Sequence, residues 1–193
     1  MGDSGEKVSY SIVVFGIAAV GKSALLIRFV HGYFEEEYDP TIASDYSKTI
    51  KLDNKSIMLK LLDTAGQDDI RSARDNYIKK GDGFIIVYAI DDEQSFEKIE
   101  EFYESIIQLK PNPCIVLCGN KADKTDDRKI TQKEGQELAD YMHASFLETS
   151  ALTGQNLENA FIEISRKIRD EKEKNKPQTP PAKKSFFDRC ELL

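Results

Sequence analysis

Hydrophobic positions recur along this chain with two different periods, the two-residue period of strands and the three-to-four-residue period of helices. The apolar and alternating runs predict six strands, at residues 9–15, 46–52, 56–62, 84–90, 114–119 and 145–148. Helical spacing predicts helices at residues 22–31, 72–79, 94–109, 131–142 and 157–172. Strands and helices in this order favour an α/β fold, with a six-stranded, mostly parallel sheet and helices on both faces.

Two local signals refine this arrangement. The Asp-Asn-Lys segment at 53–55 separates two strand-like runs and predicts a hairpin. The strand at 46–52 is therefore expected to lie antiparallel at the edge of the sheet. Thr131 is followed three residues later by Glu134, the pattern of a capping box, and so marks the start of a helix.

Length and composition limit the classes of protein that fit. A chain of 193 residues predicts one domain at 1–173, with a polar extension at 1–8, and a proline-containing tail at 174–193. The net charge of −7 argues against a nucleic-acid-binding protein. The longest apolar run, 84–90, is too short to span a bilayer, and the N-terminus lacks the pattern of a signal peptide. Three cysteines do not suggest a disulfide framework, so we expect a cytoplasmic protein.

Residues 16–23 form a complete G-x-x-x-x-G-K-[ST] sequence between a predicted strand and a predicted helix. This context fits a phosphate-binding loop, because glycines let successive N–H groups point inward and the following helix presents its positive dipole end. We expect Lys22 to reach the β- and γ-phosphates and the Ser23 hydroxyl to bind Mg²⁺. The other nucleotide-binding residues expected in and beside this loop are Ala18, Ala19, Val20, Gly21 and Ala24.

A second candidate motif, Asp63-Thr64-Ala65-Gly66-Gln67, follows the predicted strand at 56–62. A carboxylate at a strand end, opposite a phosphate loop, can hold Mg²⁺ through water, which gives Asp63 that role. By itself a D-x-x-G sequence also fits an ordinary exit from a strand into a turn. Its combination with the loop at 16–23 favours the magnesium site.

The sequence Asn120-Lys121-Ala122-Asp123 follows another predicted strand and can recognise a purine base. The Asp123 carboxylate can accept hydrogen bonds from N1–H and the exocyclic amine of guanine, whereas adenine presents no such pair of donors. The stem of Lys121 can lie across the base. A polar loop of common residues is the alternative for an isolated N-K-x-D sequence. After the next strand, Ser150-Ala151-Leu152 adds a backbone N–H, that of Ala151, which can meet guanine O6.

The polar loop after the first predicted helix contains Phe34 and Thr41. Phe34 either anchors the loop by local packing or stacks on the base. Thr41 can bind Mg²⁺ through its hydroxyl and the γ-phosphate through its N–H. Its loop would then be ordered with a triphosphate and released after hydrolysis.

Together these motifs resemble those of the Ras-type small GTPases, in particular the Ras/Rap branch. The resemblance covers about residues 9–170 and rests on five motifs in order, at 16–23, Tyr38-Asp39-Pro40-Thr41, 63–67, 120–123 and 150–151. It implies a P-loop G-domain, monomeric, that binds GTP or GDP with Mg²⁺, hydrolyses GTP slowly and acts as a signalling switch.

The resemblance also implies roles for residues and classes of partner. Gln67 would orient the attacking water. Switch I would span about residues 35–44 and switch II about residues 65–80. These segments would contact a nucleotide-exchange factor, a GTPase-activating protein and effectors. Further nucleotide contacts would come from Tyr38, Pro40 and Gly66.

The chain departs from the family pattern in three places. Ala18-Ala19 stands where Ras and Rap proteins have Gly-Gly, and a methyl group at Ala18 would occupy space beside Gln67 and the γ-phosphate. A positive φ at Ala18 would add backbone strain. Ala43-Ser44 stands where Ras proteins have Glu and Asp, so the partners of Ras itself are not assumed. Leu152 replaces the usual lysine and should weaken a contact beside the base.

The last four residues, Cys190-Glu191-Leu192-Leu193, form a C-a-a-X ending. The final leucine favours a geranylgeranyl group on Cys190, although Glu191 is not aliphatic. The tail at 174–193 also has five basic and two acidic residues. These features predict peripheral attachment to the cytoplasmic face of a membrane, expected to be the plasma membrane. The alternative is that Cys190 stands fourth from the end by chance and is not prenylated.

Two other functions stay open at this point. A scaffold locked on GTP, with negligible turnover, is favoured by Ala18 and opposed by Gln67, Thr41 and Ser23. A small-molecule kinase with a phosphate loop would need an acceptor site or a lid, and it does not explain residues 120–123.

Overall fold

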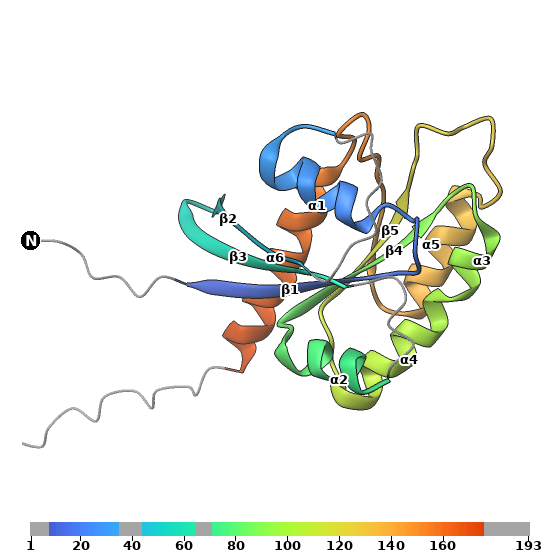
Figure 1. Ribbon diagram of the computed structural model, residues 1–193. Coiled ribbons are helices and arrows are strands. Elements are labelled where there is room, and N and C mark those ends of the chain that lie inside the picture. Colours follow the sequence, from blue (N-terminus) through green and yellow to red (C-terminus); the bar gives the residue numbers. More distant parts are fainter. Residues whose placement is uncertain (1–7, 35–43, 65–70, 176–193) are drawn as a thin grey trace, which may run out of the picture.

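The computed structural model describes residues 8–34, 44–64 and 71–175, which form one six-stranded sheet with helices around it (Figure 1). The strand order is β2-β3-β1-β4-β5-β6. Only the β2–β3 pairing among these strands is antiparallel. The predicted α/β fold with an antiparallel edge strand is confirmed. The strands are β1 (Ser9–Phe15), β2 (Ser44–Leu52), β3 (Lys55–Asp63), β4 (Gly83–Ala89), β5 (Ile115–Asn120) and β6 (Ser145–Glu148).

Two hydrophobic cores lie on the two faces of the sheet, because successive side chains of a strand point to opposite faces. One core joins the sheet to α1 and α6, and the other joins it to α2, α4 and α5. Figure 1 shows α1 and α2 on opposite sides of β1. The helices are α1 (Lys22–His31), α2 (Arg71–Lys80), α3 (Glu93–Glu97), α4 (Ile99–Leu109), α5 (Gln132–Tyr141) and α6 (Leu157–Lys174).

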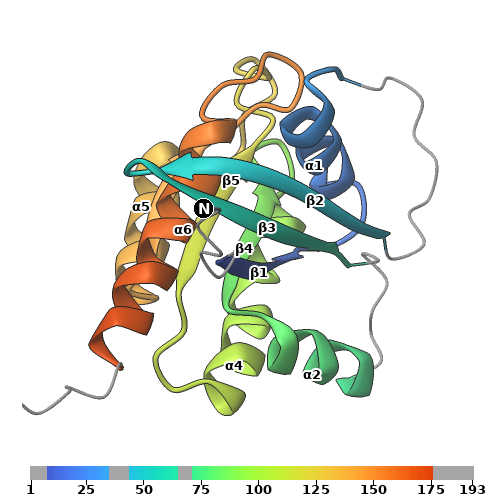
Figure 2. The ribbon, with the colours of Figure 1, turned by 90° about the vertical axis from the view of Figure 1, so that its left-hand side faces the viewer.

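The predicted hairpin between β2 and β3 is confirmed, with a turn of two residues rather than three. Leu52 pairs with Lys55, and the intervening Asp53 and Asn54 have φ values of 46° and 67°. Two consecutive positive φ values are typical of the type I′ turn, whose twist matches that of the flanking strands. Asp53 forms an ion pair with Arg169, so the turn is fastened to α6 (Figure 2).

The helix predicted at 94–109 is two helices, α3 and α4, which meet at Lys98. The Asp92 carboxylate caps α3 by accepting a hydrogen bond from Gln94 N at 3.1 Å. The buried Ser95 hydroxyl accepts a hydrogen bond from Ala89 N at 2.9 Å, which ties α3 to the end of β4. Lys98 keeps a right-handed helical backbone, so the apolar positions continue along one face and the sequence pattern does not reveal the break.

The capping box predicted at the start of α5 is confirmed. Glu134 N donates to the Thr131 hydroxyl at 3.2 Å, and Thr131 N donates to the Glu134 carboxylate at 2.8 Å. Two of the helix's otherwise unpaired N–H groups are satisfied in this way.

Tyr88 in β4 is fully buried in the second core, where its ring meets that of Phe96 edge to face. Its hydroxyl has no hydrogen-bond partner among the described residues. The hydroxyl lies against two glycines, since a methyl group added at Gly135 or Gly119 would come within 2.4 or 2.7 Å of it. Burial raises the pKa of the Tyr88 phenol, so the group stays neutral.

The helix α2 is polar along most of its length, and the buried side chains among its described ones are Arg74 and Ile78. Ile78 is fully buried, and Arg74 is 8% exposed. The Arg74 guanidinium donates to Glu101 at 2.9 Å and to Ser105 at 3.2 Å, both on α4. It also lies over the Phe102 ring, 4.9 Å from its centre. These contacts fix the first turns of α2, directly after residues 65–70, onto α4.

The substitution Tyr88→Phe should leave the free energy of unfolding unchanged or raise it by about 1 kcal/mol, because a buried hydroxyl without a partner only loses hydration. Urea denaturation followed by circular dichroism measures this. As a control for sensitivity, Leu59→Ala, also fully buried in a strand, should lose about 2–5 kcal/mol. A loss above about 1 kcal/mol for Tyr88→Phe would show that the hydroxyl has a partner.

The substitution Arg74→Ala should lower the free energy of unfolding by about 1–2 kcal/mol and speed amide exchange in α2, because it removes an ion pair and the packing on Phe102. Lys98→Ala is the matched control, since Lys98 pairs with the same Glu101 at 3.0 Å but is half exposed. It should change stability by less than about 0.5 kcal/mol. Equal effects of the two substitutions would contradict the importance of the buried arginine.

Candidate functional site

The predicted motifs come together at one edge of the sheet, where β1, β3, β5 and β6 end. These strands run parallel through the pairings β1–β3, β1–β4, β4–β5 and β5–β6. Their carboxyl ends therefore face the same side, which is where ligands bind in open α/β sheets. Residues 16–23 and 149–152 directly follow β1 and β6, and residues 63–64 and 120–123 begin at the last residues of β3 and β5.

The loop at 16–23 is shaped by glycines at its two ends. A methyl group at Gly16 would lie 2.3 Å from the Val87 carbonyl oxygen, and one at Gly21 would lie 2.5 Å from the Asn120 amide nitrogen. Both glycines also have positive φ, of 148° and 94°. Larger residues would therefore force the loop away from the neighbouring strands. Between these glycines, Val20 is 1% exposed and anchors the loop in the core.

Ala18 and Ala19 are both exposed at the tip of this loop, but they differ in backbone conformation. Ala19 has a φ of 63°, whereas Ala18 is not among the residues with positive φ. The prediction of strain at Ala18 is therefore wrong, and the strained residue is Ala19. The left-handed conformation costs a residue with a Cβ about 1–2 kcal/mol.

Lys22 and Ser23, the first residues of α1, point into the loop and toward β3. Lys22 is 6% exposed, and its ammonium group donates a hydrogen bond to the Ile17 carbonyl at 2.9 Å. The positive charge is thereby held inside the loop. The Ser23 hydroxyl donates to the Asp63 carboxylate at 2.6 Å, so the structure brings together two of the three residues predicted to bind Mg²⁺.

The Asp63 carboxylate is 1% exposed, and only one of its oxygens has a hydrogen-bond partner among the described residues. Burial raises its pKa, against the hydrogen bond from Ser23 and the charge of Lys22. A buried carboxylate oxygen without a partner, next to a hydroxyl oxygen, fits the hard oxygen ligands that Mg²⁺ prefers. No cluster of three or more His, Cys, Asp or Glu side chains suited to a metal occurs in the described part of the chain.

Asn120, at the end of β5, connects the base motif to the phosphate loop. Its side-chain amide donates to the Val20 carbonyl at 2.8 Å and accepts from the Thr149 hydroxyl at 3.3 Å. Asn120 is 1% exposed, so these bonds are shielded from water. The first residue of the predicted base motif therefore ties its own segment to the phosphate loop and to the loop that begins at Thr149.

The structure also brings together Asp123 and Ser150, from the two segments predicted to recognise the base, since the Ser150 hydroxyl donates to the Asp123 carboxylate. Ser150 is fully buried and its oxygen accepts a hydrogen bond from Thr153 N at 3.0 Å. Ala151 is 5% exposed, whereas Leu152 is 51% exposed. The two segments that were predicted to recognise the base thus form one unit, with Leu152 at its outer side.

For the other predicted site residues the structure gives less information. Phe34 is half buried and lies at the end of the segment that follows α1. Ala24 is half buried in the first turn of α1, next to the phosphate loop. The remaining predicted site residues, namely Tyr38, Pro40, Thr41, Gly66, Gln67 and Cys190, lie outside the described residues.

Two residues near the site were not predicted from the sequence. The buried Thr64 hydroxyl donates to the Val14 carbonyl at 2.8 Å, which joins the ends of β3 and β1. Asp91, just after β4, forms ion pairs with Lys121 at 3.4 Å and Lys124 at 2.8 Å. The signal that could have identified Asp91 is its position shortly after the buried strand β4, at the same end of the sheet as Asp63.

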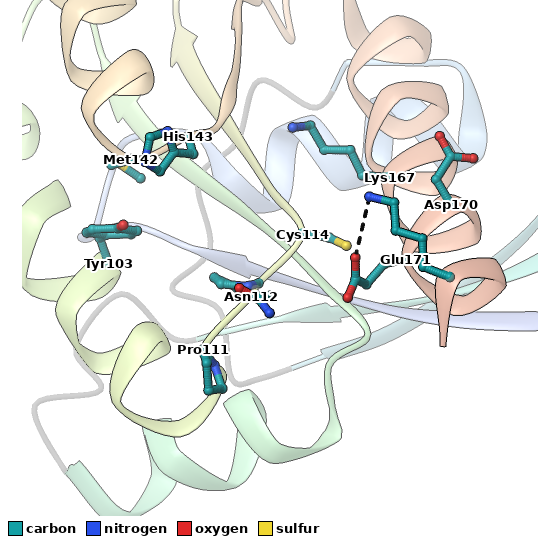
Figure 3. Close-up of a pocket in the computed structure, with 11 residues that line it drawn as sticks. Tyr103, Pro111, Asn112, Cys114, Met142, His143, Lys167, Asp170 and Glu171 are labelled. Carbon is teal, nitrogen blue, oxygen red and sulfur yellow. Dashed lines mark ion pairs between the residues drawn. The ribbon is translucent and has the colours of Figure 1, made fainter. Parts of the chain in front are cut away.

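A separate hollow of about 360 Å³ lies at the opposite edge of the sheet, before the starts of β5 and β6 (Figure 3). The ends of α4 and α6 border it, and Cys114 and His143 contribute to its lining. A pair of opposite charges, Lys174 and Glu171, crosses its rim at 3.9 Å. None of the predicted site residues lines it.

The helices described here include none that is both long and apolar enough to cross a membrane.

Comparison with known proteins agrees with this geometry. Residues 11–170 match the family model described as "Ras family". Ras-like protein rasB of Dictyostelium discoideum is 45% identical over 162 residues, which is 83% of this chain and 82% of that protein. Protein ras-1 of Neurospora crassa is 41% identical over 167 residues, which is 86% of this chain and 78% of that protein. Ras-related protein Ral-B of Rattus norvegicus is 37% identical over 198 aligned positions, which is 98% of this chain and 96% of that protein.

The phosphate loop, the paired Ser23 and Asp63, and the joined segments at 120–123 and 149–152 therefore occur in a chain that is similar to Ras proteins over most of its length. The chain belongs to the Ras family of small GTPases, whose members act in signalling.

Proposed function

We propose that this chain is a signalling switch that binds GTP with Mg²⁺ and hydrolyses it slowly to GDP by in-line attack of water on the γ-phosphate. One observation carries the proposal: the Asn120 amide, bonded to the Val20 carbonyl at 2.8 Å, joins the phosphate loop to the segment that contains Asp123. A loop that bound phosphate alone would not need to be fastened to a segment suited to guanine.

The phosphate loop would supply positive charge to the triphosphate. Lys22 is buried inside the loop, so its ammonium group would lie against phosphate oxygens together with the loop N–H groups. Ser23 and Asp63 would hold Mg²⁺, with Thr41 as a third protein ligand. When bound, Mg²⁺ neutralises charge on the β- and γ-phosphates.

The segments at 120–123 and 150–152 would select guanine. The Asp123 carboxylate, held by the Ser150 hydroxyl, would accept hydrogen bonds from the base, and the Ala151 N–H would donate to guanine O6. Lys121 and Phe34 would cover the faces of the purine ring. Leu152 is exposed and would contribute little.

Hydrolysis would depend on residues of the two switches. Gln67 would orient the attacking water, and a methyl group at Ala18 would restrict the space beside it. An arginine that stabilises the charge of the transition state is not evident in this sequence. A GTPase-activating protein would therefore supply one in trans. Stimulated turnover would therefore be sensitive to Ala18.

Family membership also supports a proposal for the partners and the location of the chain. A nucleotide-exchange factor, a GTPase-activating protein and effectors would contact residues 35–44 and 65–80. Ala43 and Ser44 would favour effectors with a less basic surface than those of Ras, because two carboxylates are missing there. A prenyl group on Cys190, with the basic tail, would attach the monomer to the cytoplasmic face of the plasma membrane. With a net charge of −7, nucleic acid is not an expected partner.

Competition between nucleotides tests the proposal. Calorimetry should show that the chain binds GDP far more tightly than ADP. The substitution Asp123→Asn should reduce GDP affinity by about 100-fold or more, because a donor replaces the acceptor that the base requires. Binding of ADP as tightly as GDP by the unsubstituted chain would overturn the assignment of guanine.

The substitution Asp63→Asn should weaken Mg²⁺ binding by about tenfold or more, measured by magnesium titration of the nucleotide complex. Burial raises the pKa of Asp63, so protons compete with Mg²⁺ at a higher pH than for an exposed aspartate. Magnesium affinity of the unsubstituted chain should therefore fall as the pH is lowered toward that pKa.

The same substitution should also change stability in the absence of Mg²⁺. The Asp63→Asn variant should be the more stable protein at neutral pH, because burial disfavours the ionised Asp63 of the unsubstituted chain. This advantage should shrink as the pH falls and Asp63 becomes protonated. Unchanged magnesium affinity would remove Asp63 from the site.

The substitution Ala18→Gly should raise the rate of single-turnover GTP hydrolysis with a Ras-family activating protein and leave GTP affinity nearly unchanged. Ala19→Gly is the matched control, since it removes the same methyl group one residue later. It should raise stability by about 1 kcal/mol, because Ala19 has positive φ, without changing the stimulated rate. Equal rates for the unsubstituted chain and the Ala18→Gly variant would show that the methyl group is accommodated, and no turnover in either would indicate a scaffold locked on GTP.

A further inference from the structure

Asp91, shortly after β4, brings a carboxylate to the base segment. Strand β4 lies between β1 and β5 in the sheet, and Asp91 comes two residues after its end. Its side chain is 13% exposed. None of the roles proposed above uses this largely buried charge.

Asp91 pairs with two lysines that stand on either side of Ala122 and Asp123. One carboxylate oxygen lies 3.4 Å from Lys121 Nζ, and the other lies 2.8 Å from Lys124 Nζ. A backbone hydrogen bond from Lys124 N to the Lys121 carbonyl, at 2.9 Å, closes this segment into a turn. A single carboxylate therefore holds both ends of the turn that contains Asp123.

The turn needs such support because its first residue has an unfavourable backbone conformation. Lys121 has a φ of 64°, in the left-handed region that residues with a Cβ seldom adopt. Strained conformations persist where surrounding contacts determine them, and they cluster at ligand sites. The ion pair with Asp91 is one of those contacts.

Asp91 is itself held on a rigid base. Its neighbour Ile90 donates to the Asn120 carbonyl at 3.0 Å, and the Ile90 carbonyl accepts from Lys129 N at 2.8 Å and Ile130 N at 3.0 Å. Burial of Asp91 opposes its ionisation, but Lys124 and Lys121 hold its pKa below the ordinary value. The carboxylate therefore carries its charge at neutral pH.

We propose that Asp91 is a positioning residue for base recognition, which fixes Lys121 over the purine and holds the turn that presents Asp123. This inference rests on the proposed binding of guanine nucleotide. Its consequence is specific: Asp91 sets how long the nucleotide stays bound, and it has no part in the cleavage of the γ-phosphate.

Nucleotide release from the full chain tests this role. Release of a fluorescent GDP analogue should be about tenfold faster for Asp91→Ala and a few-fold faster for Asp91→Asn, which keeps an acceptor but loses the charge. Lys124→Met should also speed release and should add little in the Asp91→Ala background, because the two residues act together. Asp126→Asn is the matched control: it removes the same charge from an exposed position of the same loop and should change release by less than about twofold.

Two further measurements distinguish a positioning role of Asp91 from a general loss of stability. Single-turnover hydrolysis of preloaded GTP should stay within about twofold of the unsubstituted rate for Asp91→Asn. Amide exchange should become faster at residues 121–124 and stay unchanged in β4 and β5. Release unchanged in Asp91→Ala would overturn the inference while the proposed function stands, as would exchange that is faster throughout both strands. If the unsubstituted chain binds no guanine nucleotide, the proposed function fails and this inference fails with it.

Discussion

The hydrogen bond from the Asn120 amide to the Val20 carbonyl, 2.8 Å long and buried, is the contact on which the arrangement of the site depends. It joins positions 100 residues apart, and the same side chain accepts from Thr149. Three loops are thereby fixed relative to one another by a single amide. The short distance between the Asn120 side chain and the phosphate loop also explains why position 21 is a glycine, because a methyl group there would lie 2.5 Å from the Asn120 nitrogen. The phosphate loop and the base segment are therefore one structural unit.

The parallel strands supply this unit with carboxylates at their ends. Asp63 ends β3, and Asp91 and Asp123 come shortly after β4 and β5. Each is held by a partner from another segment: a serine for Asp63 and Asp123, and lysines for Asp91. Carboxylates seldom lie in such buried positions without a partner, because the loss of hydration is costly. The partners therefore fix where each negative charge lies, which is what a site for Mg²⁺ and guanine requires.

Much of this could be predicted from the sequence, because the fold is encoded in local periods and the motifs lie at strand ends. The boundaries of β1, α1 and β6 match the prediction, and the capping box of α5 is present. What could not be predicted depends on tertiary contacts. The break at Lys98 keeps the helical period, the positive φ falls on Ala19 rather than Ala18, and Asp91 forms ion pairs with lysines 30 or more positions away. The roles of the switch residues and of the tail stay predictions.

Hydrogen exchange with and without nucleotide tests the central claim most directly, because it reports on every segment of the site in one experiment. Addition of GDP with Mg²⁺ should slow exchange together at residues 16–24, 120–123 and 150–152, and ADP with Mg²⁺ should not. Protection of the phosphate loop alone, or equal protection by ADP, would contradict a single guanine-nucleotide site. Protection confined to the hollow at the opposite edge of the sheet would place the ligand elsewhere.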